Sequence, residues 1–215
     1  MRFDTVIWDL DGTLLDTLAD LAASVNAAMT AFGYPVRSMT EIRQMVGNGV
    51  SNLVLRALPE KHKEDHAAAL AVFRAHYSEH YADKTLPYPG ICKAVDSLRE
   101  CNVSMAVVSN KLHAITKALC DQYFGDRIGV VVGDRPGIPR KPAPDSVQLA
   151  LKQLGADPSR AVYVGDSEVD IATARNANLP CISVGWGFRP AQVLLDAGAE
   201  EVIPNVGTLM ERLLG

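Results

Sequence analysis

Two aspartates separated by one residue stand at the end of a short hydrophobic run near the start of the chain. The sequence from residue 7 reads Ile-Trp-Asp-Leu-Asp-Gly-Thr, which places Asp9 and Asp11 directly before a glycine. In an extended strand, side chains two positions apart point to the same face, so these carboxylates should project together. Carboxylates this close repel one another unless a cation lies between them or one keeps its proton. Either arrangement suits an enzyme, and the pair alone leaves both open.

Further polar side chains follow apolar runs or precede a helix elsewhere in the chain. They are Ser109 and Asn110 after residues 103–108, Asp166 and Asp170 after residues 161–164, and Lys141 before a helix expected from Pro144. In open α/β sheets, ligands bind outside the carboxyl ends of the strands, where the strand order reverses. The pattern therefore predicts carboxylates, a hydroxyl and an ammonium around one crevice.

Short apolar runs and helical patterns alternate through most of the chain. The runs span residues 5–8, 103–108, 128–132, 161–164, 181–184 and, more weakly, 201–203. Nearly continuous apolar strands are typical of a parallel sheet buried on both faces. Helices are predicted over residues 111–124 and 144–154. The alternation predicts an α/β fold with a doubly wound, mainly parallel, Rossmann-like sheet.

A long helical stretch interrupts this alternation. Residues 17–84 contain no convincing strand but at least three amphipathic helical patterns. We therefore expect a catalytic core formed by residues 1–16 and 85–215, with residues 17–84 inserted as an all-helical cap domain. The Asp16-Thr17 corner and the proline-rich return at residues 86–90 form a plausible hinge.

Composition excludes several classes of partner and location. A formal net charge of −4 in 215 residues argues against nucleic acid, which is bound by a broad cationic surface. The cysteines Cys92, Cys101, Cys120 and Cys181 form no CxxC pair and lie among apolar residues, so we expect reduced interior thiols. Without a signal peptide or a membrane-length apolar run, we expect a cytoplasmic protein that binds no membrane.

The ordered motifs resemble those of the haloacid dehalogenase superfamily. They are Asp9-Leu-Asp-Gly-Thr-Leu-Leu-Asp-Thr17, Ser109-Asn110-Lys111, Lys141-Pro-Ala-Pro144 and Val164-Gly-Asp-Ser-Glu-Val-Asp170. Within the superfamily the chain is most similar to the phosphoglycolate phosphatase branch. That similarity rests on the helical insert, on Val46-Gly-Asn-Gly-Val50 within it, and on Gly185-Trp-Gly-Phe-Arg-Pro190 near the end.

The resemblance implies a division of roles among these residues. Asp9 would attack phosphorus and form an aspartyl-phosphate, and Asp11 would protonate the leaving alkoxide and then deprotonate the attacking water. Mg²⁺ would be held by the Asp9 carboxylate, the Asp11 main-chain oxygen and Asp166, with Asp170 as a further metal residue. Lys141 and Ser109 would bind the phosphoryl oxygens.

Other assignments leave a structural alternative open. Thr13 and Asn110 are assigned to the phosphate side of the site, although Thr13 could serve the turn alone. Gly47 and Asn48 could contact substrate from the cap or simply form an interhelix turn. Asp170 could cap a helix together with Ser167. The histidine pairs spaced by four residues are interpreted as a solvated face.

The function indicated is a Mg²⁺-dependent phosphatase for a small phosphorylated metabolite, with 2-phosphoglycolate as the favoured substrate, in a monomer or homodimer. A sugar phosphomutase or a pyrophosphatase could use the same core residues. A protein of another class, a non-catalytic phosphate-binding regulator, would be expected to have lost Asp9 or Asp11, and both are present.

Overall fold

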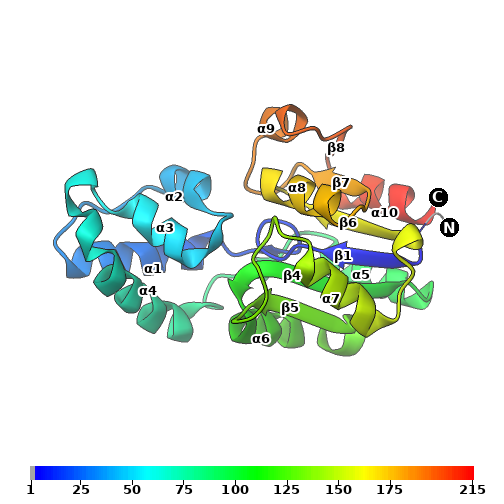
Figure 1. The fold of residues 1–215 in the computed structure, drawn as a ribbon, viewed down its shortest axis with the longest axis horizontal. Coiled ribbons are helices and arrows are strands. Elements are labelled where there is room, and N and C mark those ends of the chain that lie inside the picture. The colour runs from blue at the N-terminus through cyan, green and yellow to red at the C-terminus, as the bar shows by residue number, and fades with distance from the viewer. Residues whose placement is uncertain (1–2) are drawn as a thin grey trace. The chain divides into compact units, whose positions relative to one another are not determined.

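The computed structural model describes residues 3–215 and consists of two compact units (Figure 1). One unit contains the N-terminal segment through Leu15 together with Pro87–Gly215, and the other is Asp16–Leu86. The structure thus divides the chain after residues 15 and 86, where the sequence suggested divisions after residues 16 and 84. Short strands β2 (Leu15–Asp16) and β3 (Leu86–Pro87) pair where the chain passes between the units.

The larger unit is built on a six-stranded sheet in the order β5-β4-β1-β6-β7-β8, whose strand pairs are parallel. The strands are β1 Thr5–Trp8, β4 Ser104–Leu112, β5 Val130–Asp134, β6 Ala161–Gly165, β7 Cys181–Val184 and β8 Val202–Ile203. This confirms the predicted doubly wound α/β fold. Strand order reverses at β1, since the chain runs outward through β4 and β5 and then returns to β6 on the other side.

Register places the end of β1 between its two neighbours. Trp8 lies opposite Val107 of β4 and Val164 of β6. The backbone N–H of Asp9 then donates a 2.9 Å hydrogen bond to the carbonyl of Val164. Asp9 is therefore fixed at the carboxyl edge of the sheet, at the point where the strand order reverses.

Helices cover both faces of this sheet (Figure 1). They are α5 Ile91–Glu100, α6 His113–Tyr123, α7 Asp145–Leu154, α8 Glu168–Asn176, α9 Ala191–Asp196 and α10 Val206–Leu214, with 3-10 turns η2 Gly125–Arg127 and η3 Pro158–Arg160. On one face, Ile7, Val108 and Tyr163 pack against α7 and α8 through residues such as Val147 and Ala174. Burial of these alternate strand residues explains why the strands read as continuous apolar runs.

Some boundaries and environments differ from those predicted. The strand expected to end at residue 108 continues to Leu112, with a shift of register between Val108 and Leu112. Ser109 and Asn110 therefore lie within β4 rather than after it. The prediction of interior thiols was wrong for Cys101, which is exposed at the end of α5, although all four cysteines are free.

The smaller unit, Asp16–Leu86, is helical apart from the strand residues at its ends. Its helices are α1 Leu18–Ala31, α2 Met39–Met45, α3 Gly49–Ala57 and α4 His66–His80, with the 3-10 turn η1 Glu60–Asp65 before α4. Helices α1 and α4 pack together over the buried side chains of Val25, Phe73 and Tyr77. Across residues 3–215, no helix has the length and apolar character needed to cross a membrane.

Asp20 ties the two ends of the smaller unit together. Its buried carboxylate accepts hydrogen bonds from the backbone N–H groups of Lys84 (3.0 Å) and Thr85 (2.8 Å) and from the Thr85 hydroxyl (2.8 Å). Thr17 precedes α1, and its side chain makes no capping hydrogen bond. Asp20 instead holds the returning chain against the first turn of α1.

Candidate active site

Lys141 occupies the centre of the site at the carboxyl edge of the sheet. Its ammonium Nζ donates to Asp9 Oδ1 at 2.7 Å, to Asp170 Oδ1 at 2.8 Å and to the Tyr163 hydroxyl at 3.0 Å. These four side chains are buried. The structure thus brings together Asp9, Lys141 and Asp170, which lie far apart in the sequence.

Asn110 holds the backbone of Lys141 rather than leaving its side chain free. The amide Nδ2 donates to the Lys141 carbonyl at 3.0 Å, and the amide oxygen accepts from the Lys141 N–H at 2.9 Å. The neighbouring Ser109 is also buried, and its hydroxyl oxygen accepts from the N–H of Lys111 at 3.2 Å. That acceptor role leaves the Ser109 hydroxyl proton available for a ligand oxygen.

Asp166 is fixed from two directions. Its Oδ1 accepts from the Thr13 hydroxyl at 3.2 Å, and its Oδ2 accepts from the backbone N–H of Phe188 at 2.6 Å. Two glycines make room for it: a Cβ on Gly12 would stand 2.7 Å from Asp166 Cγ, and one on Gly187 would stand 2.5 Å from it. Gly12 also has a φ of +90°, which favours glycine.

Asp170 combines the two roles that the sequence left open. Its Oδ2 accepts from the N–H and hydroxyl of Ser167 in a capping box at the start of α8. Its Oδ1 accepts from Lys141 and from the Tyr163 hydroxyl. The helix-cap interpretation is confirmed, and the same carboxylate also orients the Lys141 ammonium.

Asp11 lies apart from this group and has its own cation. Lys111 Nζ donates to Asp11 Oδ1 at 2.9 Å. Asp9 and Asp11, which are separated by a single residue, are therefore each paired with a different lysine. The two lysines thus give the two carboxylates separate charge-assisted hydrogen bonds.

Asp9, Asp166 and Asp170 are buried near Lys141, so the carboxylates of this group outnumber its cation. Burial and the nearby charge of Asp170 raise the pKa of Asp9 well above its ordinary value and raise that of Asp166 to about 7. Burial lowers the pKa of Lys141, but the charges of Asp170 and Asp9 outweigh this and raise it well above 10.5. Lys141 therefore stays protonated, but its single positive charge does not balance the carboxylates around it.

This environment fits a hard divalent cation. Asp9, Asp166 and Asp170 each offer a carboxylate oxygen, and the three atoms lie within 4.8 Å of one another. Mg²⁺ binds oxygen ligands of this kind. Because burial raises the pKa values of Asp9 and Asp166, an added cation would stabilise their charged forms.

The predicted cap residues lie in the smaller unit. Gly47 and Asn48 form the turn between α2 and α3, and both are half-buried. The Asn48 carbonyl accepts from the Asn52 side chain at 2.9 Å, and Gly47 has a φ of +124°. Their assignment to substrate stays a prediction.

Sequence reasoning missed several residues that support the site. Tyr163 lies within β6, where a tyrosine in an apolar run reads as core, and Lys111 was noted only as part of a motif. Trp186 donates its indole N–H to the Thr13 carbonyl at 3.0 Å, and Phe188 binds Asp166 through its backbone. The Gly185-Trp-Gly-Phe motif was the available signal, but nothing in it specifies what its backbone contacts.

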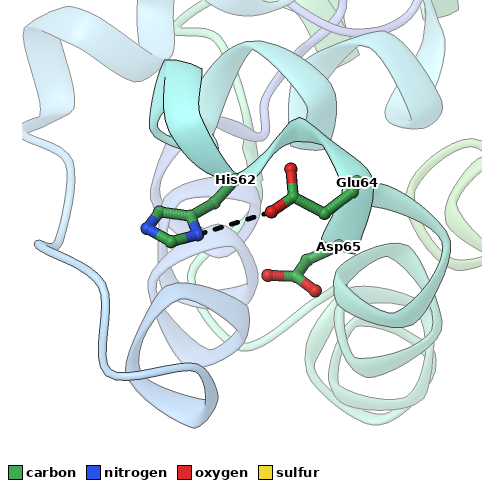
Figure 2. A group of neighbouring side chains, drawn as sticks. All are labelled: His62, Glu64 and Asp65. Carbon is green, nitrogen blue, oxygen red and sulfur yellow. Dashed lines mark ion pairs between the residues drawn. The ribbon is translucent and has the colours of Figure 1, made fainter.

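A second cluster of possible metal ligands lies in the smaller unit. His62, Glu64 and Asp65 stand on the η1 turn, with His62 and Glu64 paired at 3.7 Å (Figure 2). His62 and Glu64 are exposed, and Asp65 accepts a hydrogen bond from the Tyr34 hydroxyl. His66 begins α4, and its Nε2 lies 2.9 Å from the Ser51 carbonyl.

Comparison with known proteins places the chain in a family. The sequence model of the haloacid dehalogenase-like hydrolases matches residues 6–184. Phosphoglycolate phosphatase 1 of Pseudomonas aeruginosa is 32% identical over 212 residues, covering 95% of this chain and 78% of that protein. A phosphoglycolate phosphatase of Chromobacterium violaceum is 32% identical over 215 residues, covering 96% of this chain and 94% of that protein.

A solved structure supports the same relationship. A protein from Lactobacillus delbrueckii subsp. bulgaricus, provisionally assigned as a phosphoglycolate phosphatase, matches with a TM-score of 0.96 and 35% identity over 100% of both chains. The family match covers most of the chain and includes Asp9, Lys141 and Asp166. The resemblance drawn from the four motifs is confirmed, and the chain is a member of the haloacid dehalogenase-like hydrolase family.

Proposed function

We propose that this enzyme is a Mg²⁺-dependent phosphatase that hydrolyses 2-phosphoglycolate through an aspartyl-phosphate on Asp9. The observation that carries the proposal is the pairing of Asp9 with Lys141 and of Asp11 with Lys111 at one edge of the sheet. This separation gives the two carboxylates different tasks. The names of the relatives from Pseudomonas aeruginosa and Chromobacterium violaceum support the choice of substrate.

In the first step, Asp9 attacks phosphorus while the bond to the substrate oxygen breaks. Lys141, at 2.7 Å from Asp9, supplies positive charge beside the attacking oxygen, and the Ser109 hydroxyl donates to a phosphoryl oxygen. The departing alkoxide takes a proton from Asp11. The product is glycolate, and phosphate remains on Asp9.

In the second step, water attacks the phosphorus of the aspartyl-phosphate. Asp11 takes the proton from that water, and the bond between phosphorus and the Asp9 oxygen breaks, which restores the Asp9 carboxylate. Asp9, Asp166, Asp170 and the main-chain oxygen of Asp11 would hold Mg²⁺, and Asp170 would also orient Lys141. When bound, Mg²⁺ would offset the repulsion between the carboxylate and the phosphate.

We further propose that Asp16–Leu86 acts as a mobile cap that selects the substrate, with Gly47 and Asn48 contacting the leaving group. The short β2–β3 pair and the Asp20 contacts with Lys84 and Thr85 would keep the connecting segments in register. Free cysteines fit a reducing compartment, so the cytoplasm is the proposed location.

Initial rates on a substrate panel test this function. The panel contains 2-phosphoglycolate, sugar phosphates, nucleoside monophosphates and pyrophosphate, each assayed with Mg²⁺ and with EDTA, and Asp9→Asn serves as the blank. We expect Mg²⁺-dependent phosphate release that is fastest from 2-phosphoglycolate. A preference for pyrophosphate, or a shift of phosphate within a sugar phosphate, would contradict the substrate assignment. Tight phosphate binding without turnover would contradict the enzyme itself.

A further inference from the structure

Lys111 is a buried cation that the predicted mechanism does not use. Its ammonium lies 2.9 Å from Asp11 Oδ1, and its side chain is 1% exposed while that of Asp11 is 16% exposed. We propose that Lys111 is a positioning residue that holds Asp11 for hydrolysis of the phosphorylated enzyme. This inference rests on the proposed function and adds a residue to it.

The structure fixes Lys111 along its backbone as well as at its ammonium. Its N–H donates to the Ser109 hydroxyl oxygen at 3.2 Å, and its carbonyl accepts from the Thr116 hydroxyl at 3.1 Å. A Cβ on Gly133 would stand 2.8 Å from the Lys111 carbonyl oxygen, so the neighbouring strand also packs closely against this peptide. The backbone that carries the Lys111 side chain is therefore held by hydrogen bonds and close packing at the end of β4.

The pairing suits a proton acceptor. A charge-assisted hydrogen bond to Oδ1 restricts the carboxylate to one orientation and leaves Oδ2 for an incoming proton. Lys111 is separate from Lys141, which binds Asp9 Oδ1 at 2.7 Å. Phosphate on Asp9 can therefore change the surroundings of Lys141 while the contact between Lys111 and Asp11 is kept.

The two chemical steps depend differently on this acceptor. When the leaving group is a stable phenolate, the first step needs no proton, because the phosphorus–oxygen bond breaks with its electron pair remaining on the phenolate. The second step always requires removal of a proton from water as the bond from phosphorus to Asp9 breaks. Loss of Lys111 should therefore slow the second step and spare the first for such a substrate.

The test uses the Mg²⁺-loaded protein with 2,4-dinitrophenyl phosphate as the probe. For Lys111→Met we expect kcat to fall by at least about tenfold, as general-base catalysis contributes about 10²–10⁴-fold. We expect KM to fall with it, so that kcat/KM, which reports the first step, stays within about threefold of wild type. Rapid acid quench should find more of the enzyme as the aspartyl-phosphate at steady state than in wild type.

Matched variants separate positioning from stability. Lys117→Met removes a lysine that is 59% exposed and paired with Asp121, and should leave both constants unchanged. Lys111→Arg keeps the cation and should restore most of kcat. Lys111→Gln gives a second neutral variant if the methionine protein does not fold.

Three results would overturn the inference. The first is a parallel fall in kcat and kcat/KM without accumulation of the aspartyl-phosphate. The second is unchanged kinetics in Lys111→Met. The third is unfolding of both neutral variants, which would assign Lys111 to stability alone. A wild-type protein that releases no dinitrophenolate with Mg²⁺ would instead refute the proposed function, and the inference with it.

Discussion

Gly187→Ala should displace Asp166 without straining the backbone at the site of substitution. The new Cβ would stand 2.5 Å from Asp166 Cγ and closer still to its Cβ and Oδ2, whereas ordinary contacts begin near 3.4 Å. The nearest Asp166 atoms, at 2.3 Å, must therefore retreat by about 1.1 Å, the difference between 3.4 and 2.3 Å. Such a shift would also weaken the 2.6 Å hydrogen bond from Phe188 to Asp166.

The expected cost has two parts. Overpacking of this size destabilises a protein by about 1–3 kcal/mol. Displacing a proposed metal ligand and its supporting hydrogen bond should weaken Mg²⁺ binding by about 10–100-fold, the range seen when the groups that orient metal ligands are altered. Isothermal titration with Mg²⁺ and thermal unfolding in EDTA measure the two parts separately.

Gly185→Ala is the matched control in the same loop. Its Cβ would meet Val202 Cγ1 at 3.0 Å and the Ile203 carbonyl oxygen at 3.4 Å, and it would not reach Asp166. We expect its Mg²⁺ affinity to match that of the wild type. The reasoning is refuted if Gly187→Ala binds Mg²⁺ within about twofold of wild type.

Further predictions concern Asn110, Asp20 and pH. Asn110→Ala removes both hydrogen bonds to the Lys141 backbone and should lower kcat by about tenfold and the unfolding free energy by about 1–3 kcal/mol; equal kcat would contradict this. Asp20→Ala removes the acceptor of the Lys84 and Thr85 N–H groups and should lower the unfolding free energy by about 2–4 kcal/mol in urea titrations; an unchanged midpoint would contradict this. In EDTA, the melting temperature should fall as pH rises from about 5 to about 8. The reason is that a carboxyl whose pKa is raised in the folded state contributes its full stabilisation only below the pKa that it has in the unfolded chain. For Asp166 that stability is lost as pH passes through about 7, and Mg²⁺ should raise the melting temperature most at high pH; a profile that is flat would contradict this.

The strands of the sheet could be predicted from the sequence because they are buried on both faces. The strands predicted at residues 5–8 and 181–184 have the same bounds as β1 and β7, since each is a short apolar run between polar segments. β4 was cut short because Ser109, Asn110 and Lys111 resemble a loop. Their backbone nevertheless stays extended in the sheet, and their side chains serve the site.

The sequence predicted that the candidate site residues lie close together, but it did not predict their contacts. Motif spacing places Asp9, Lys141 and Asp166 at one edge of the sheet because parallel strands end together there. The partners of Lys111 and Asn110 depend on residues 100 and 31 positions away, which no local pattern specifies. The hydroxyl of Tyr163 could likewise be assigned only once the fold placed Lys141 above it.

The covalent intermediate on Asp9 tests the central claim most directly. The protein is mixed with ³²P-labelled 2-phosphoglycolate and Mg²⁺, quenched in acid within milliseconds and digested, and the labelled peptide is identified by mass spectrometry. We predict label on the peptide that contains Asp9, its release by hydroxylamine, and no label in Asp9→Asn. Continued turnover by Asp9→Asn, or rapid turnover in wild type with label on another residue, would contradict the account.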